Sequence, residues 1–197
     1  MTGTPGRPLS AELSEQLLGV AVDILAEDGW SRLNSDRSAA RARAGKAGIY
    51  RRWPSMPAMV REAVSRFDLV QIPDDTGSLR GDLFGLLERW TRPLDRQERA
   101  TASIVGAARF DDDLRAGLDT AIGRPLTAAV TELGRRALER HEITDPARLL
   151  LLGSVLEAFW WQRFTTAGDG ALDQDQVERI VDDVMLPAAG LRAAAAV

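Results

Sequence analysis

The hydrophobic positions of this chain repeat with the period of an α-helix. In the first such segment, Leu13, Leu17, Ala21 and Ile24 fall on one face of a helix. No stretch alternates apolar and polar residues over about six positions with β-branched enrichment, as a half-buried strand would. The pattern therefore predicts an all-α fold of about nine helices.

Capping and helix-stopping residues set the expected ends of these helices. Ser10 can cap the first helix, and Gly29 stands where its C-terminal turn is expected. Asp173 and Gln176 form a capping pair for the last helix. The other helices are expected at about 35–42, 46–52, from 55, 79–90, 98–109, 112–122, 124–141 and 145–165. The Pro- and Asp-containing stretch 72–78 is a candidate domain boundary.

The second and third of these helices are short and separated by only a few residues. A short helix, a tight connection and a short basic helix together are typical of a helix-turn-helix, whose second helix enters the major groove of DNA. Ile49 and Trp53, four residues apart, can pack inward. Lys46, Tyr50, Arg51 and Arg52 are then left to face outward, where basic side chains can bind phosphates and base edges.

The helix-turn-helix segment contains Ala39-Ala40-Arg41-Ala42, Gly45-Lys46-Ala47 and Ile49-Tyr50-Arg51-Arg52-Trp53-Pro54-Ser55, and the arm Gly6-Arg7-Pro8 precedes it. Together these motifs give residues 6–66 a resemblance to the N-terminal region of the TetR family of bacterial transcriptional repressors. It implies a DNA-binding domain at 1–55 and a ligand-binding and dimerisation domain at 56–197. It also implies a homodimer, an operator with two half-sites, and a pocket whose ligand releases the DNA. The candidate DNA-binding residues are Arg7, Asn34, Ser35, Arg43, Gly45, Lys46, Gly48, Tyr50, Arg51 and Arg52.

The chain departs from the family pattern at four of these positions or near them. Arg43 stands where glycine is usual in the turn, and a positive φ there would cost an arginine roughly 1 kcal/mol. Gly48 replaces a threonine, which removes a hydroxyl contact and weakens a short helix by roughly 1 kcal/mol relative to alanine. Met56 and Pro57 replace a lysine and a glutamate. These departures concern operator affinity more than the fold.

Charge is unevenly distributed along the chain. The net charge is -4, but residues 1–66 carry +3 and residues 67–197 carry -7. Between Arg32 and Arg52 there are seven basic residues and one acidic residue, Asp36. A basic head on an acidic body indicates contact with a polyanion, and a solvated arginine-rich helix face is the alternative.

Composition excludes several kinds of chemistry. The absence of cysteine excludes disulfides and thiolate zinc sites, and the single histidine, His141, excludes multi-histidine metal sites. The run Asp111–Asp113 favours a helix start over a metal site.

With no nucleophile–histidine pair and no glycine-rich phosphate loop, we expect no enzyme and no cofactor. A helical protein–protein adaptor is the alternative to a DNA-binding regulator. With no bilayer-spanning run and no signal peptide, we expect a cytoplasmic protein.

Aromatic residues of the body are candidates for an effector pocket. They could line a cavity for a small amphipathic or aromatic molecule, or they could form ordinary core or core plus a dimer seam. Glu157, inside an apolar stretch, either pairs with an arginine such as Arg163 or marks a polar spot in the pocket. The candidate pocket residues are Trp90, Phe110, Glu157, Trp160, Trp161 and Phe164.

Two of the later helices carry more apolar surface than one amphipathic face requires. A monomer would expose more of this surface than soluble proteins usually tolerate, so the helices at about 146–165 and 174–189 are expected to form a homodimer. The candidate interface residues are Leu152, Val155, Leu156, Val177, Val181 and Val184.

Overall fold

A computed structural model describes residues 11–166 and 168–191, and this part of the chain contains helices and no strands. The all-α prediction is thereby confirmed. The chain divides into two compact units. The first runs to Phe67 and also includes Arg99–Leu118, and the second comprises Asp68–Glu98 and the chain from Asp119 onward.

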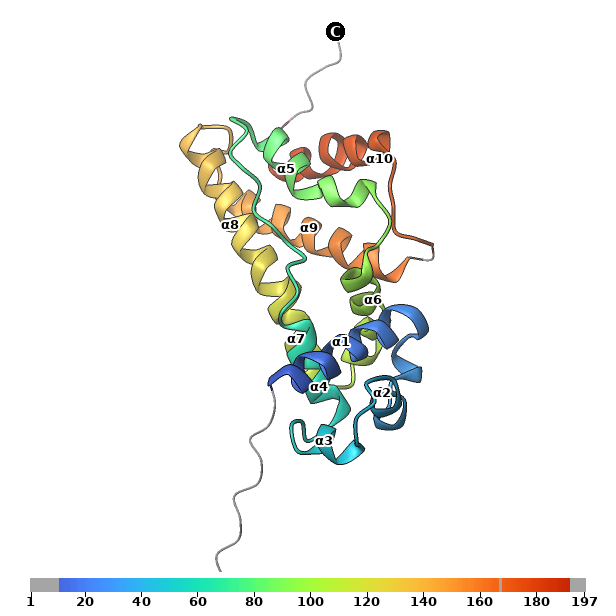
Figure 1. Cartoon of the computed structure of the whole chain (residues 1–197). Coiled ribbons are helices and arrows are strands. Elements are labelled where there is room, and N and C mark those ends of the chain that lie inside the picture. Colours follow the sequence, from blue (N-terminus) through green and yellow to red (C-terminus); the bar gives the residue numbers. More distant parts are fainter. Residues whose placement is uncertain (1–10, 167, 192–197) are drawn as a thin grey trace, which may run out of the picture. The chain divides into compact units, whose positions relative to one another are not determined.

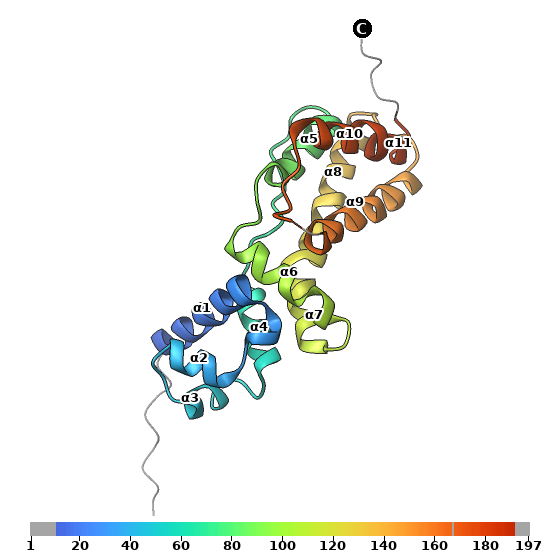
Figure 2. The same cartoon turned by 90° about the vertical axis from the view of Figure 1, so that its right-hand side faces the viewer.

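The first unit is a helical cluster, and α2 and α3 lie at one end of it (Figures 1 and 2). Its elements are α1 (Ala11–Asp28), the 3-10 turn η1 (Trp30–Arg32), α2 (Ser35–Arg41), α3 (Lys46–Tyr50), α4 (Met56–Val64), most of α6 (Arg96–Ala108) and α7 (Asp112–Leu118). Helix α1 packs on α2 and α4, and α2 packs on α3. Leu17, Ile24 and Met59 lie in the fully buried core.

The first unit is larger than the expected domain 1–55. Helix α4 packs closely on α7, and Arg61 of α4 forms a 2.6 Å ion pair with Asp113 of α7. The Asp111 side chain accepts a hydrogen bond from the Leu114 N–H, as a helix cap does. The acidic run therefore begins α7, as predicted, and attaches α7 to the first unit.

The second unit is built around two long helices, α8 (Arg124–Glu139) and α9 (Ala147–Thr165), which pack on each other. Its other elements are α5 (Leu79–Leu87), the 3-10 turn η2 (Glu88–Thr91), α10 (Gln174–Arg179) and α11 (Leu186–Ala188). Helix α5 packs on α8, and α11 packs on α9. The predicted capping box at Asp173 and Gln176 begins α10.

Two π-helical turns interrupt these helices, and each ends two residues before a proline. The turn η3 (Asp119–Gly123) precedes Pro125 of α8, and η4 (Ile180–Met185) precedes Pro187 of α11. Proline has no N–H to donate and its ring collides with the carbonyl one turn earlier. A wider turn relieves that conflict without ending the helix.

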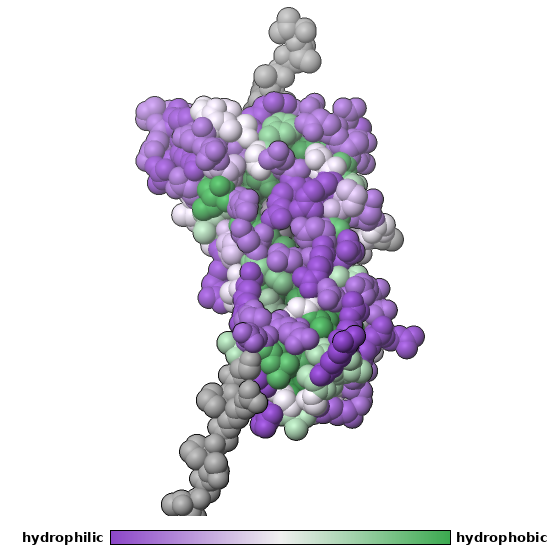
Figure 3. Space-filling model, viewed as in Figure 1, coloured by the Kyte–Doolittle hydropathy of each residue, from purple (hydrophilic) through white to green (hydrophobic). Residues whose placement is uncertain are grey.

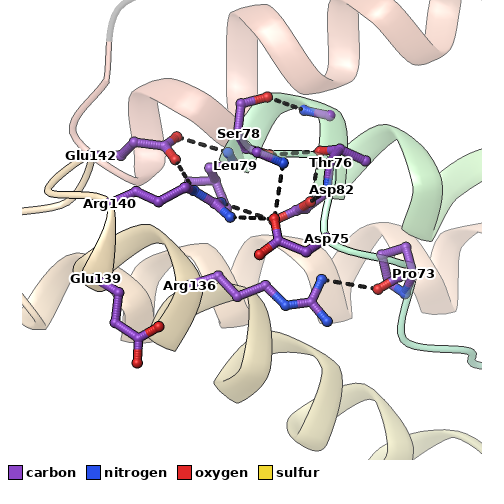
Figure 4. A network of polar contacts seen from close by, with 12 residues as sticks. Pro73, Asp75, Thr76, Ser78, Leu79, Asp82, Arg136, Glu139, Arg140 and Glu142 are labelled. Atoms are coloured by element: carbon purple, nitrogen blue, oxygen red, sulfur yellow. Dashed lines mark hydrogen bonds and ion pairs between the residues drawn. The ribbon is translucent and has the colours of Figure 1, made fainter.

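A buried carboxylate attaches the start of α5 to the end of α8 (Figure 4). Asp82 is fully buried, and it accepts hydrogen bonds from Thr76 and, at 2.9 Å, from Arg140. Burial alone would raise the pKa of Asp82, but these hydrogen bonds outweigh burial and lower it. Glu142 accepts a hydrogen bond from the Leu79 N–H at 2.7 Å and so adds to the cap of α5.

Polar residues cover most of the face drawn in Figure 3, and the apolar patches among them are small. The described residues contain no helix that is both long and apolar enough to cross a membrane.

Candidate functional site

The turn between α2 and α3 is a Schellman motif with arginine at its left-handed position. The Ala44 N–H bonds the Ala39 carbonyl at 2.9 Å, and the Arg43 N–H bonds the Ala40 carbonyl at 3.1 Å. Arg43 itself has φ of 50°. The condition considered for the sequence, a positive φ at Arg43, is thus met, and it is a conformation that glycine adopts at lower cost.

Helix α3 is short and depends on its surroundings for support. Its N-cap, Gly45, provides no side-chain hydrogen bond, and Gly48 lies in the middle of the helix. As predicted, Ile49 and Trp53 point inward, with 1% and 4% of their surfaces exposed. The Trp53 indole N–H donates to Glu62 of α4 at 2.6 Å. These contacts fix the orientation of α3, although its own helix propensity is low.

Arg52 supports α3 from the side of α1. Its Nε donates to the Ser14 hydroxyl at 2.8 Å, and its Nη1 donates to the Gly48 carbonyl at 2.8 Å. Arg52 is therefore half-buried and held within the first unit, and the expectation that it faces outward is wrong. Gly48 is also buried, so the position is not an open contact surface.

Tyr50 connects α3 to the start of α2. Its side chain is 55% exposed, and its hydroxyl donates to the Ser35 Oγ at 3.1 Å. Ser35 is itself buried, and its hydroxyl faces Tyr50. Asn34 caps α2 by accepting the Arg37 N–H at 2.9 Å. Asn34 and Ser35 thus hold the start of α2 and the tyrosine ring in place.

The basic side chains within α2 and α3 are all paired with acids of the first unit. Arg37 pairs with Asp28, Arg41 pairs with Glu27 at 2.7 Å, and Lys46 pairs with Asp36. Such pairs consume positive charge that could otherwise bind an anion.

Three guanidinium groups of the helix-turn-helix are different. Arg32, Arg43 and Arg51 are exposed, and within the described part of the chain their guanidinium groups have neither an ion pair nor a hydrogen bond. They are therefore available to bind an external anion. Arg7, which was also expected to contact DNA, lies outside the described residues.

Some of the candidate pocket residues line hollows of the second unit, and they are divided between two of these hollows. A cavity of about 210 Å³ is lined by Trp90, Phe159 and Arg163 among others. A larger groove of about 670 Å³ runs between α8 and α9 and is lined by Glu157 and Trp161 among others. Glu157 accepts the Trp161 indole N–H at 3.4 Å, and the acid that pairs with Arg163 is Glu98.

The remaining candidate pocket residues line neither hollow. Trp160 is buried against Trp90, with ring centroids 5.5 Å apart in an edge-to-face arrangement, and Phe164 is also buried core. Phe110 belongs to the first unit, where 87% of its surface is exposed. Its assignment to the pocket is wrong, because the turn after α6 belongs to the first unit and not to the body.

Most of the candidate interface residues are core residues of the second unit. Leu152, Leu156, Val177 and Val181 are each at most 1% exposed, so they cannot contact a second chain directly. Val155 is half-buried and Val184 is 38% exposed. The large apolar residues that α9 does expose are Leu150, at 78%, and Leu151, at 46%. The sequence pattern identified an apolar helix but not which of its faces is used by the chain's own core.

Comparisons with known proteins identify the family. Residues 73–184 match the family model described as "Tetracyclin repressor-like, C-terminal domain", which covers more than half of the chain. The chain belongs to the TetR family. The family model matches residues 73–184, whereas the sequence resemblance covers residues 6–66. The two findings therefore rest on different parts of the chain and support the same family.

Relatives of known description agree with membership of the TetR family. The chain is 32% identical to a "DNA-binding transcriptional repressor TetR" of Mycobacteroides abscessus, over 88% of this chain and 92% of that one. It is also 32% identical to an HTH-type transcriptional regulator of Mycobacterium tuberculosis, over 87% of this chain and 85% of the relative.

Solved structures agree with the fold. A putative TetR-family regulator from Rhodococcus sp. matches with a TM-score of 0.60 and 17% identity over 89% of this chain and 100% of that one. The TetR-family regulator SCO0332 matches with a TM-score of 0.59 and 24% identity, over 88% and 97%. This TetR-family protein is a DNA-binding transcriptional regulator, and the adaptor alternative is not favoured.

Proposed function

We propose that this TetR-family regulator is a ligand-responsive repressor that binds a two-half-site operator as a homodimer. The observation that carries the proposal is the set of three uncompensated guanidinium groups, Arg32, Arg43 and Arg51, on a helix-turn-helix whose other described arginines are held by partners. The repressor role is supported by the Mycobacteroides abscessus relative, which is a DNA-binding transcriptional repressor by name.

The exposed groups of α3 suit two kinds of contact. Arg51 and Tyr50 lie at the end of the helix and are exposed, so they are our candidates for base edges and for fixing register. Lys46 can exchange Asp36 for a phosphate, because an exposed ion pair is worth little. Arg32 and Arg43 form no ion pair within the described residues, so they can bind phosphate without breaking one and are candidates for phosphate contacts.

The apolar face for a homodimer is the groove between α8 and α9 with the leucines beside it. Leu150 is among the most exposed large apolar side chains of the described residues, and it lines the groove together with Val130 and Trp161. A second copy placed there would cover these side chains. Two-fold symmetry would present two copies of α3 to DNA about 34–36 Å apart.

The proposal is tested by anisotropy of labelled genomic fragments that the wild-type protein retains. Replacing Arg51 by alanine should weaken binding by about 1–3 kcal/mol, because a base or register contact is lost. Arg109→Ala is the matched control: Arg109 is exposed and without an ion pair in the described structure, and it lies in the same unit after α6.

The expected result is a large loss for Arg51→Ala and little change for Arg109→Ala. Equal losses of DNA affinity in both variants would mean that any exposed arginine contributes to binding. That result would contradict the proposal that α3 contacts the DNA bases. Retention of full affinity by Arg51→Ala would contradict it as well.

A further inference from the structure

The smaller cavity of the second unit lies beside a deeply buried cation. It measures about 210 Å³, and Trp90, Phe159, Leu172 and Ile180 provide most of its apolar wall. Arg163 also lines it, although only 3% of that side chain is exposed. A cavity of about 150 Å³ holds a benzene-sized molecule, so this one has room for a single ring with a small substituent.

The Arg163 guanidinium is held mainly by neutral groups. It donates to the backbone carbonyls of Arg89 and Arg92 at 3.1 and 3.3 Å, and to those of Trp90 and Gly170. The carboxylate that it contacts is Glu98, at 3.3 Å. Burial lowers the pKa of Arg163, and Glu98 opposes that effect.

Glu98 does not serve Arg163 alone. It also pairs with Arg92 at 2.8 Å, while the neighbouring Asp95 pairs with Arg92 and Arg89. Three guanidinium groups therefore share two carboxylates in this cluster, and Arg163 is the one that lines the cavity. Asp169 also lines the cavity, but it is exposed and its carboxylate accepts the N–H of Ala171.

We propose that this cavity binds a small monocarboxylic acid with a compact apolar body, such as a single-ring aromatic acid. The apolar body would fill the space against Trp90 and Phe159, and the carboxylate would supply Arg163 with the negative charge that the cluster lacks. The proposal rests on the ligand response proposed above and specifies the class of its ligand.

Through Glu98, a ligand bound at Arg163 can affect helix α6. Glu98 and Asp95 form a reciprocal cap at the start of α6: each side chain accepts the other residue's backbone N–H, at 2.8 and 2.9 Å. From Arg99 onward α6 belongs to the first unit. A carboxylate that competes for Arg163 would loosen the contact between Arg163 and Glu98 and so alter how this end of α6 is held.

Benzoate and its neutral isostere benzamide are the probes, and tryptophan fluorescence of the full chain is the readout, since Trp90 lines the cavity. We expect saturable quenching by benzoate with an affinity about tenfold above that of benzamide. Ala171→Leu fills part of the cavity from its wall and should weaken benzoate binding at least tenfold. Ala171→Ser is the matched control, because it changes that side chain with little added volume.

Arg163→Met tests the charge directly and should remove the preference for benzoate over benzamide. If that variant fails to fold by circular dichroism, Ala171→Leu still decides the question. Absence of saturable quenching, equal affinities for the two probes, or unchanged binding by Ala171→Leu would each overturn the proposal.

The titration is made without DNA, so its outcome is independent of the proposed repressor function. A repeat with bound operator fragments should show that benzoate lowers DNA affinity in the wild type and not in Ala171→Leu. A protein that binds benzoate as described but retains no DNA fragment would contradict the proposed function and leave the ligand site supported.

Discussion

Replacing Arg43 by glycine should stabilise the protein and weaken its binding to DNA at the same time. Arg43 occupies the left-handed position of the turn after α2, with φ of 50°. Its guanidinium is exposed and has neither an ion pair nor a hydrogen bond within the described residues, so the substitution breaks no such interaction there. The backbone and the charge of this residue therefore have opposite consequences.

The size of the stability gain follows from two opposing terms. A left-handed conformation costs a non-glycine residue about 1–2 kcal/mol, and glycine avoids that cost. Glycine also gives the unfolded chain more freedom, which costs about 0.4–1 kcal/mol. The expected net gain in the free energy of unfolding lies between about 0 and 1.6 kcal/mol and is centred near 0.8 kcal/mol.

Urea unfolding followed by circular dichroism measures the stability, and a salt titration of DNA binding measures the charge. Losing one phosphate contact should lower the slope of log affinity against log salt by about one unit. Arg43→Ala is the matched control, because alanine loses the same charge but keeps a Cβ at the left-handed position. It should weaken DNA binding as Arg43→Gly does, without the gain in stability.

Equal stability of the glycine and alanine variants would refute the argument from backbone strain. A salt slope unchanged in both variants would refute the assignment of Arg43 to phosphate contact.

Three further changes probe the supporting contacts. Arg52→Ala should cost about 1–2 kcal/mol of stability and weaken DNA binding without changing its salt slope, because Arg52 bonds Ser14 and the Gly48 carbonyl; a slope lowered by one unit would contradict this role. Asp82→Asn should cost about 2–3 kcal/mol at neutral pH, since it leaves Arg140 less compensated. Because the pKa of Asp82 is lowered in the folded state, its contribution to stability is present above the unfolded pKa of about 4 and is lost as pH falls through the folded pKa. The stabilities of the wild type and of Asp82→Asn should therefore converge in acid. A stability difference that does not change with pH would contradict this role of Asp82. Leu150→Asp should yield monomers in sedimentation at micromolar concentration, whereas Leu152, buried in the same helix, offers no surface for such a test; a dimer unchanged by Leu150→Asp would place the interface elsewhere.

Local signals in the sequence predict most of the helices. Asn34, Ser55 and Ser78 each cap the helix that follows by accepting a backbone N–H at 2.9–3.1 Å. Capping depends on neighbours in the chain, so the sequence is sufficient for it. The inward packing of Ile49 and Trp53 could also be predicted, because a spacing of four residues determines a shared helix face.

The roles of individual arginines could not be predicted in this way. Arg52 and Arg51 are adjacent and chemically identical, yet Arg52 is bonded to Ser14 on α1, whereas Arg51 has no ion pair or side-chain hydrogen bond within the described residues. Arg163 is buried because carbonyl groups of the η2 turn surround it, more than 70 residues away in sequence. Such contacts depend on tertiary packing, and no local pattern encodes them.

The sequence also could not predict which face of the apolar helix α9 is buried and which is exposed. Leu150 and Leu152 are both leucines in one apolar run, but the first is 78% exposed and the second is fully buried. When apolar residues cover most of a helix, periodicity does not distinguish the chain's own core from a surface for another chain. The small turn that leaves Phe110 exposed gives no sequence signal that we can identify.

Selection of DNA fragments from the source genome tests the central claim most directly. The wild-type protein and a variant with Arg32, Arg43 and Arg51 all replaced by alanine are offered the same fragments at physiological salt. Our account predicts that the wild type enriches a sequence with two inverted half-sites whose centres are about 10 base pairs apart, or a multiple of that spacing, and that the variant enriches none. Equal enrichment by both proteins, or no enriched sequence with the wild type, would contradict it.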